Sequence, residues 1–420
     1  MARQIRRVVV LGANGAMGAG SGEVFAAAGI ETTFLARTKD KALEGQKRAE
    51  KLAKSTALGR FIKVGSYDAD LARAVAEADL VFEAVSEDLA LKRVYFEQID
   101  KHRRADAIVA TVSSGLSIAA MAATGGASFA RHFLGIHFFN PPNVIVGCEL
   151  IPHAGSDPLV VADVDDLLRN RLGRELVRTS DTPAFCGNRV GFKVLNECAQ
   201  LAGEHGAAYI DALVGPHTGR AMAPLATIDF VGWDVHAAIV DNVYANTKDE
   251  AHAAFLMPEA MRAKMATGCL GDKTPDKGGF FRKGDKGAPK AEVPAVARKM
   301  KELHHVGRYK EAFDVFAEAT GADAELMRRV ILGYVSYGLG RVGEVVEKVA
   351  DVDRIMGFGF NWAPPGVLVD LIGARRTVAL VEAARLPVPR ALVDAAERNT
   401  RLFDAPHVDI GRFFHGEGAR

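Results

Sequence analysis

Short apolar runs that alternate with helical stretches limit the fold of the N-terminal part more than any other feature. Such a rhythm is typical of a parallel sheet with helices on both faces. The runs expected to form strands are Val8 to Leu11, Thr32 to Leu35, Leu80 to Val85, Ile108 to Thr111, Phe133 to Ile136 and Glu175 to Val177. The stretches expected to form helices include Glu23 to Ala28, Lys39 to Ala57, Leu91 to Lys101 and Leu159 to Arg169.

The strand pattern ends near Thr182, and amphipathic segments replace it. Val190 to His205, Val235 to Asn246 and Pro258 to Thr267 are predicted helices, and the polar stretch Asp272 to Pro294 is a predicted exposed connection. The fold class is therefore α/β plus all-α. The expected domains are 1–182, a Rossmann-type doubly wound sheet, 183–290, a first helical domain, and 291–420, a second helical domain.

The two helical domains share a weak internal repeat. Ile210-Asp211 matches Val352-Asp353, and Asp229 to Gly232 matches Asp370 to Gly373, at offsets of 141 to 142 residues. The pair Arg189-Val190 matches Arg329-Val330 at an offset of 140. Chance matching is the alternative, but three landmarks at nearly one offset favour a degenerate duplication. In the second copy Arg328 stands where the first has Asn188, so we expect the second copy to be structural.

Composition excludes several classes of function. The formal net charge of +1 gives no field that would attract nucleic acid or an anionic membrane surface. No apolar stretch approaches the roughly 20 residues that span a bilayer, and the apolar run near the start is too short for a secretory signal. The four cysteines lack C-x-x-C spacing, which favours a reduced, cytoplasmic protein over disulfides or a metal site.

A glycine-rich turn follows the first predicted strand and opens a helix. It reads Gly12-Ala13-Asn14-Gly15-Ala16-Met17-Gly18. Glycines let the backbone approach a pyrophosphate, whose charge then meets the N–H groups at the helix start. The G-x-x-G-x-x-G spacing is one residue longer than the usual dinucleotide fingerprint, so a merely tight turn is the alternative reading.

The end of the second predicted strand bears on the choice of cofactor. A carboxylate there normally grips the ribose 2′-hydroxyl of NAD, but this chain reads Ala36-Arg37-Thr38. Arg37 could accept the 2′-phosphate of NADP, or it could extend into solvent or stack on the adenine. NAD and NADP both stay open on this evidence.

Polar residues cluster after two later strands. Ser113-Ser114-Gly115 follows one strand, and His137 lies at the end of another in His137-Phe138-Phe139-Asn140-Pro141-Pro142, twelve residues before Glu149. An imidazole exchanges protons near neutral pH and can take the proton of a secondary alcohol during hydride transfer. Glu149 could hold the other ring nitrogen. A histidine beside aromatic residues is more often a packed core residue.

Taken together these segments resemble the (S)-3-hydroxyacyl-CoA dehydrogenases, especially the long form of bacterial fatty-acid β-oxidation proteins. The resemblance covers almost the whole chain. It rests on the glycine turn, Ala78 to Glu87, the serine segment, His137 to Pro141 with Glu149, Asp181 to Arg189, and Gly271-Asp272-Lys273-Thr274.

The resemblance implies roles for individual residues. His137 corresponds to the general base and Glu149 to its orienting carboxylate, while Ser114 and Asn188 correspond to the groups that hold the 3-oxygen of the substrate. Glu87 and Lys92 correspond to a pair on the nicotinamide side of the pocket, although an exposed salt bridge at a helix start is the alternative. Relatives often read Ser-Asn-Thr-Ser-Ser where this chain reads Thr111-Val112-Ser113-Ser114-Gly115, so either serine could be the substrate contact, with Ser114 favoured by alignment.

The resemblance also implies an activity and partners. It implies interconversion of 3-hydroxyacyl-CoA and 3-oxoacyl-CoA with NAD, an acyl-CoA substrate, and an enoyl-CoA hydratase or thiolase as possible partner. The basic region Lys39 to Lys63 corresponds to one that meets the CoA nucleotide, with a solvated helix face as the alternative. We expect a monomer in which the second helical domain replaces a dimer partner. The alternatives are an NADPH-dependent reductase of another small hydroxy acid and a non-catalytic scaffold for a hydratase.

Overall fold

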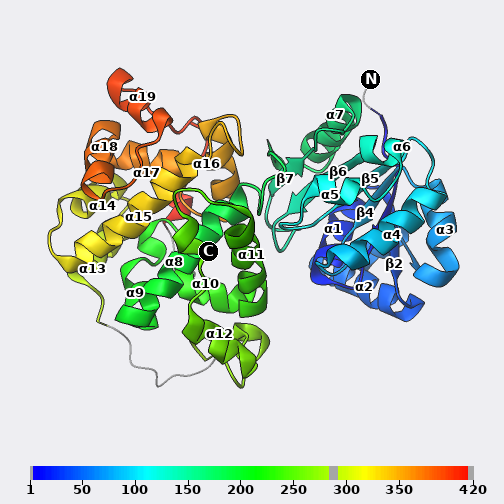
Figure 1. The fold of residues 1–420 in the computed structure, drawn as a ribbon, viewed down its shortest axis with the longest axis horizontal. Helices are drawn as coiled ribbons and strands as arrows, with labels where there is room; N and C mark the ends of the chain where they lie inside the picture. The colour runs from blue at the N-terminus through cyan, green and yellow to red at the C-terminus, as the bar shows by residue number, and fades with distance from the viewer. Residues whose placement is uncertain (1–2, 283–291, 415–420) are drawn as a thin grey trace. The chain divides into compact units, whose positions relative to one another are not determined.

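The computed structural model describes residues 3–282 and 292–414 of the 420-residue chain. The chain divides into two compact units, Met1–Phe185 and Cys186–Arg420, and each is described by itself (Figure 1). We call them the nucleotide-binding unit and the helical unit. The predicted boundary between the two helical domains, at residues 290 and 291, lies outside the described residues.

The nucleotide-binding unit contains one eight-stranded sheet in the order β3-β2-β1-β4-β5-β6-β7-β8. The first six positions have the doubly wound order, in which the sequence reverses direction between β1 and β4. All neighbouring strands are parallel except β6 and β7, which are antiparallel. The bounds are β1 Arg7–Leu11, β2 Glu31–Ala36, β3 Ile62–Ser66, β4 Leu80–Glu83, β5 Ile108–Thr111, β6 Phe133–Phe138, β7 Gly147–Ile151 and β8 Glu175–Arg178.

Helices cover both faces of this sheet, as expected. Val10 faces a core formed with α1 (Ala16–Ala27), α2 (Lys39–Leu52) and α7 (Pro158–Asp166). Leu11 faces a second core, formed with α3 (Tyr67–Glu77), α4 (Leu89–His102), α5 (Ile118–Ala122) and α6 (Ala127–Arg131). The fully apolar inner strands follow from this burial on both faces.

Several predicted elements were wrong in extent, and two strands were not predicted. The first helix begins at Ala16 rather than Glu23, because the residues of the glycine turn continue directly into it. α2 ends at Leu52 instead of Ala57, since Thr56–Phe61 forms a separate 3₁₀ turn. β3 and β7 lack a continuous apolar run because they contain Lys63 and Glu149.

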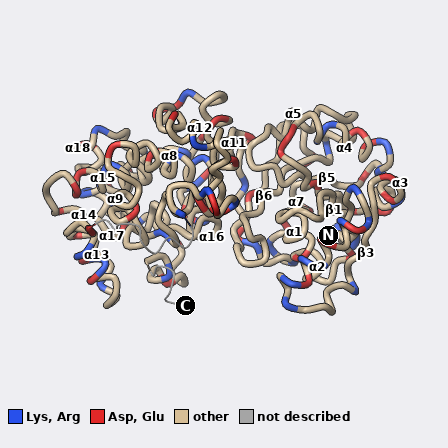
Figure 2. The backbone as a smooth tube through the Cα atoms, turned by 90° about the horizontal axis from the view of Figure 1, so that it is seen from below, with Lys and Arg blue, Asp and Glu red and all other residues tan. Residues whose placement is uncertain are grey.

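The helical unit contains no strand among its described residues except isolated bridges. Its helices are α8 Gly187–His205, α9 Ala207–Leu213, α10 Pro224–Val231, α11 Trp233–Asn246, α12 Glu259–Ala266, α13 Ala295–His305, α14 Tyr309–Glu318, α15 Ala322–Gly340, α16 Val349–Phe358, α17 Pro365–Ile372, α18 Ala374–Ala383 and α19 Arg390–Arg398. No helix of the described residues is long and apolar enough to cross a membrane. Basic and acidic residues are interspersed along both units (Figure 2).

Matching elements recur in the two parts of the helical unit. α8 and α15 have 19 residues each, and α10 and α17 have eight residues each with proline in the first turn. Gly232 and Gly373 end these short helices with φ angles of 97° and 99°. A β-branched or other side chain would be strained at both positions, which explains why the sequence places glycine at each.

Candidate active site

The glycine turn lies between β1 and α1, next to the end of β4. Gly12 has a φ of 74°, and a Cβ atom at this position would come within 2.2 Å of the carbonyl oxygen of Ala84. A Cβ at Gly18 would come within 2.3 Å of the carbonyl oxygen of Gly12. Two of the three glycines are therefore required by close approach of the backbone, and the longer spacing still gives a compact turn.

The start of α1 suits a phosphate group. Gly15 precedes the helix and supplies no side-chain cap, and no acidic residue lies in the first turn. Asn14, Ala16 and Met17 are at least partly exposed beside it. The backbone N–H groups of a helix start attract an anion, so these residues fit the pyrophosphate of a dinucleotide.

Tyr67 supports the turn and was not predicted from the sequence. Its hydroxyl accepts a hydrogen bond from the backbone N–H of Gly12 at 2.9 Å. Burial raises the pKa of Tyr67 to about 12, so the hydroxyl stays protonated at physiological pH. No spacing rule connects a tyrosine at the start of α3 with a glycine 55 residues earlier, and so only the fold reveals this contact.

Arg37 lies at the end of β2, where the expected carboxylate is missing. Its side chain is exposed, and the next residue, Thr38, caps α2 by accepting a hydrogen bond from the N–H of Lys41 at 3.2 Å. Thr38 is thus engaged in the helix cap, and Arg37 is the side chain of this pair that is left to meet a ribose or a phosphate.

His137 and Glu149 form a buried pair at the carboxyl end of β6. Nδ1 of His137 lies 2.7 Å from Oε2 of Glu149, and the two residues are direct neighbours across the antiparallel strands β6 and β7. Their exposures are 3% and 0%. The ring packs against Phe139 and Phe185, with centroids 4.8 and 5.7 Å apart. A carboxylate at Nδ1 fixes the tautomer and stabilises the imidazolium form, which is the requirement for a directed base.

The serine turn after β5 is tied to Glu87. Oε1 of Glu87 accepts hydrogen bonds from the hydroxyl of Ser113 at 2.5 Å and from the backbone N–H of Ser114 at 2.9 Å. Ser113 is buried and Ser114 is partly exposed. Of the two serines, Ser114 is the more exposed, which makes it the better candidate for a substrate contact.

Glu87 and Lys92 do form an ion pair at the start of α4, but the Lys92 side of this pair is buried. The side chain of Lys92 has 0% exposure, and Nζ lies 2.9 Å from Oε1 of Glu83 and 3.4 Å from Oε2 of Glu87. Glu83 ends β4 and is equally buried. We gave Glu83 no role from the sequence, although an acidic residue inside an otherwise apolar strand is a signal that could have been used.

Asn188 is the second residue of α8 and belongs to the helical unit. It is buried, with 6% exposure. The structure brings His137 and Glu149 together in the nucleotide-binding unit, which also contains Ser114, and it places Asn188 in the other unit.

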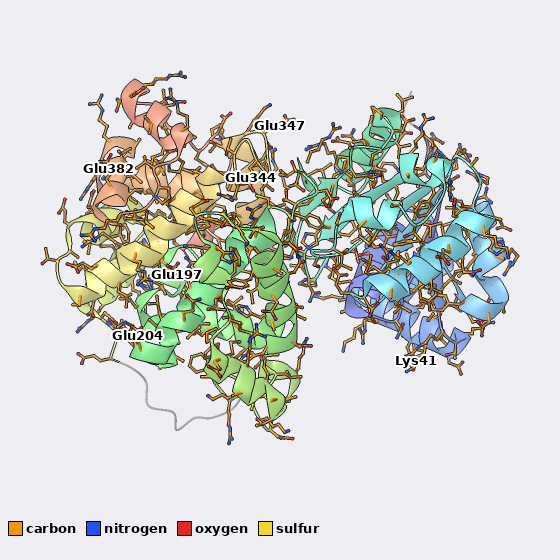
Figure 3. All side chains as sticks on the ribbon, in the orientation of Figure 1. Lys41, Glu197, Glu204, Glu344, Glu347 and Glu382 are labelled. Atoms are coloured by element: carbon orange, nitrogen blue, oxygen red, sulfur yellow. The ribbon has the colours of Figure 1, made fainter. Side chains whose placement is uncertain are left out.

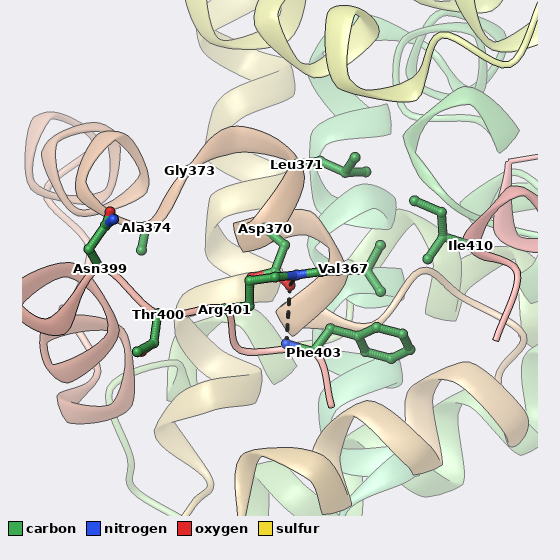
Figure 4. A pocket seen from close by; sticks show the side chains of 10 residues that line it. All are labelled: Val367, Asp370, Leu371, Gly373, Ala374, Asn399, Thr400, Arg401, Phe403 and Ile410. Carbon is green, nitrogen blue, oxygen red and sulfur yellow. Dashed lines mark hydrogen bonds and ion pairs between the residues drawn. The ribbon is translucent and has the colours of Figure 1, made fainter. Parts of the chain in front are cut away.

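A cavity of about 250 Å³ lies elsewhere, in the second part of the helical unit (Figure 4). Its lining includes Asp370, whose carboxylate accepts hydrogen bonds from Arg401 and from the backbone N–H groups of Leu402 and Phe403. None of the predicted site residues lines this cavity.

The doubly wound sheet, the glycine turn and the oriented histidine define a dinucleotide-binding oxidoreductase. Residues 7–182 match the NAD-binding domain of 3-hydroxyacyl-CoA dehydrogenase, and residues 185–280 match the C-terminal domain of the same enzymes. The chain belongs to the 3-hydroxyacyl-CoA dehydrogenase family.

Individual relatives agree with this membership. A probable 3-hydroxyacyl-CoA dehydrogenase of Deinococcus radiodurans is 32% identical over 294 residues, which cover 67% of this chain and 83% of that protein. A probable 3-hydroxyacyl-CoA dehydrogenase of Bacillus subtilis is 28% identical over 360 residues, but the match spans 82% of this chain and 45% of that protein. The chain therefore corresponds to less than half of the Bacillus protein.

A solved structure supports the fold of nearly the whole chain. The 3-hydroxybutyryl-CoA dehydrogenase of Escherichia coli K12 superposes with a TM-score of 0.72 at 21% identity, covering 94% of this chain and 99% of that one. This likeness extends across the nucleotide-binding unit and most of the helical unit.

Proposed function

We propose that this chain interconverts (S)-3-hydroxyacyl-CoA and 3-oxoacyl-CoA by hydride transfer with NAD, in fatty-acid β-oxidation or related acyl-CoA metabolism. The observation that carries the proposal is the buried pair His137 and Glu149, at 2.7 Å, in the same doubly wound unit as the glycine turn. Family membership supports the substrate class and the cofactor.

His137 is the general base in this proposal. In oxidation, Nε2 takes the proton of the substrate's hydroxyl, and Glu149 stabilises the imidazolium that forms, because its carboxylate contacts Nδ1. A bound nicotinamide cofactor supplies the hydride acceptor. In reduction the same imidazolium returns the proton to the oxygen.

Ser114 and Asn188 are the proposed donors to the substrate's 3-oxygen. Negative charge develops on this oxygen during hydride transfer, and preorganised donors stabilise it. Glu87 supports the role of Ser114, because it holds the backbone N–H of this residue and thereby fixes the turn. Glu87, Lys92, the glycine-turn residues and Arg37 are the proposed contacts of the cofactor.

Steady-state reduction of acetoacetyl-CoA and of a longer 3-oxoacyl-CoA, with NADH and NADPH in parallel, tests the proposal. We expect turnover of both esters with NADH. Turnover that depends on NADPH would assign Arg37 to the 2′-phosphate, and turnover of free 3-hydroxybutyrate but not of its CoA ester would favour a hydroxy-acid reductase. Absence of hydride transfer together with tight binding of an enoyl-CoA hydratase would favour the scaffold alternative.

We also propose that the two parts of the helical unit form an internal pseudo-dimer. Nε of Arg189 donates to the hydroxyl of Tyr337 at 3.0 Å, and Nε of Arg329 lies 3.6 Å from Glu197. Arg329 and Tyr337 follow Arg189 and Glu197 by 140 residues each, so the two contacts are reciprocal, as across a two-fold axis.

A second contact supports the same axis. Arg220 and Trp362 form an antiparallel bridge, and their neighbours Gly219 and Asn361 both have positive φ angles, of 86° and 54°. Such self-matching contacts favour a monomer in solution. Sedimentation equilibrium should give the mass of one chain, and an obligate dimer built through α8 would contradict the proposal. A hydratase or thiolase partner and a cytoplasmic location remain predictions of the family resemblance and of the cysteine spacing.

A further inference from the structure

A buried ion pair lies beneath the carboxyl ends of β4 and β5. Nζ of Lys92 is 2.9 Å from both carboxylate oxygens of Glu83, and both side chains have 0% exposure. Removing two charges from water costs several kcal/mol per ion unless their contacts are complete, so a pair at this depth requires an explanation. The proposed mechanism uses Glu87 and Lys92 but gives Glu83 no task.

The contacts of Glu83 are complete. Besides Lys92, its Oε1 accepts a hydrogen bond from the backbone N–H of Val85 at 2.6 Å, and its Oε2 accepts one from the hydroxyl of Thr111 at 2.6 Å. Thr111 is the direct neighbour of Glu83 in the sheet, and its hydroxyl oxygen also accepts from the N–H of Ser113 at 3.2 Å. Three donor groups, on Lys92, Val85 and Thr111, therefore make four hydrogen bonds to the carboxyl group of Glu83.

Glu87 forms a weaker ion pair with Lys92 than Glu83 does. Its distance to Nζ is 3.4 Å, and its side chain is 41% exposed. Glu83, Glu87 and Lys92 together carry a formal charge of −1. Both carboxylate oxygens of Glu83 lie closer to Nζ of Lys92 than Glu87 does, so Glu83 balances most of the positive charge of Lys92. The excess negative charge of the three residues therefore lies on the exposed one, Glu87.

This excess charge lies on the side of the sheet that takes the second half of a dinucleotide. Ligands of doubly wound sheets bind beyond the carboxyl ends of the strands, where β1 and β4 diverge, and β4 to β6 form the half opposite to the adenine half. Glu87 contacts the serine turn that carries Ser114, the proposed substrate contact. An oxidised nicotinamide ring is positively charged, and a reduced ring is neutral.

We propose that Glu83 is a positioning residue that selects the oxidised cofactor: by balancing Lys92, it leaves the negative charge of Glu87 to stabilise the cationic nicotinamide ring. The proposal rests on the proposed function for the place of the ring. Replacing Glu83 by a neutral side chain turns the full charge of Lys92 toward Glu87 and cancels this stabilisation.

The test is the ratio of dissociation constants for NAD⁺ and NADH in the full-length chain. Titration by NADH fluorescence, with NAD⁺ measured by competition, gives both constants without turnover. We expect Glu83→Gln to raise the Kd for NAD⁺ about 10-fold and the Kd for NADH less than about 3-fold, because only the oxidised ring is charged. Equal changes for the two forms, or no change for either, would overturn the proposal.

Two further variants separate this effect from damage to the fold. Thr111→Val removes one of the four hydrogen bonds to Glu83 and should change the ratio in the same direction by a smaller factor, whereas Thr111→Ser should restore it. If Glu83→Gln does not fold, Thr111→Val alone decides, and an unchanged ratio would contradict the proposal.

The chain offers a matched control in the helical unit. Lys193 and Glu197 form a buried pair of the same length, 2.9 Å, with side-chain exposures of 6% and 10% (Figure 3 labels Glu197). Glu197→Gln should lower thermal stability and leave the NAD⁺ to NADH ratio unchanged. A wild-type chain that binds both cofactors but reduces no acyl-CoA would refute the proposed function, while the ratio would still decide the role of Glu83.

Discussion

Four buried ionisable side chains, two in each unit, differ in the contacts that they make. In the nucleotide-binding unit, the buried carboxylates Glu83 and Glu149 each contact a group that can carry positive charge, at 2.9 and 2.7 Å. In the helical unit, Asp353 and Arg220 are equally buried, but Oδ2 of Asp353 and two guanidinium nitrogens of Arg220 have no hydrogen-bond partner among the described residues. Arg220 instead lies 4.2 Å from the ring centroid of Trp362.

The paired groups belong to the proposed site, whereas Asp353 and Arg220 lie in the helical unit outside it. A paired buried charge is expensive to break, because the remaining partner is left alone in a medium of low dielectric constant. An unpaired one already carries that cost, so its removal is neutral or favourable. Substitutions of similar size should therefore lower stability more at a paired buried charge than at an unpaired one.

The largest effect is expected at His137. His137→Gln keeps the approximate size of the side chain and a hydrogen-bonding end toward Glu149, but it removes the proposed base. We expect kcat for acetoacetyl-CoA to fall by about 10² to 10⁴, which is the usual cost of losing a general base. The Kd for NADH and the thermal midpoint should stay near the wild-type values. Turnover close to wild type would refute the assignment of the base.

The same replacement can be made in both units at Lys92 and Arg220. Lys92→Met leaves Glu83 buried without its partner and should lower the free energy of unfolding by about 3 to 5 kcal/mol. Arg220→Met removes a lone charge whose pKa burial lowers, and loses a cation–π contact of about 1 to 2 kcal/mol, so it should change stability by less than about 1 kcal/mol. Denaturant titration measures both, and equal losses would contradict the comparison.

Glu149→Gln should have an intermediate effect on activity. The amide can still contact Nδ1 of His137, but it no longer stabilises the imidazolium. We expect a loss in kcat of about 10- to 100-fold, as is common for partners that orient a reacting group. A change in KM alone, with an unchanged kcat, would argue for a purely structural role.

The smallest effect concerns stability and pH in the helical unit. Burial raises the pKa of Asp353 from 3.8 to about 8, and that of Asp211, its counterpart in the first part of the unit, to about 6. Between the unfolded and the folded pKa only the unfolded chain loses the proton, so stability falls as pH rises through this window. Asp353→Asn should therefore stabilise the chain more at pH 8 than at pH 4.

Asp211→Asn is the control for that prediction. Asp211 accepts two backbone hydrogen bonds, from Leu225 and Ala226, whereas Asp353 accepts one, from Gly366. The stability of the chain should depend on the titration of Asp211 only up to about pH 6. The gain in stability from Asp211→Asn should therefore be smaller than that from Asp353→Asn. Thermal midpoints of both variants from pH 4 to pH 8 check the two windows, and a gain that does not depend on pH would exclude titration as the cause.

Much of the fold could be predicted from the sequence, because burial on both faces leaves continuous apolar runs such as Ile108–Thr111. β7 escaped prediction for a physical reason. It carries Glu149, which is buried only because His137 lies opposite, and a lone strand pattern cannot reveal its partner. The resemblance predicted the roles of His137 and Glu149, while Glu83, Thr111 and Tyr67 act through contacts between distant parts of the chain.

The antiparallel register of β6 and β7 has a consequence for the connection between them. His137 meets Glu149 because they are ladder partners, and the twelve residues that separate them matter only through that pairing. Residues inserted into the turn between Phe139 and Val146 should be accommodated as long as the register of β6 and β7 is unchanged. A shift of the register of β7 by a single residue would point Glu149 to the opposite face of the sheet. The imidazole of His137 would then lose its contact with the carboxylate.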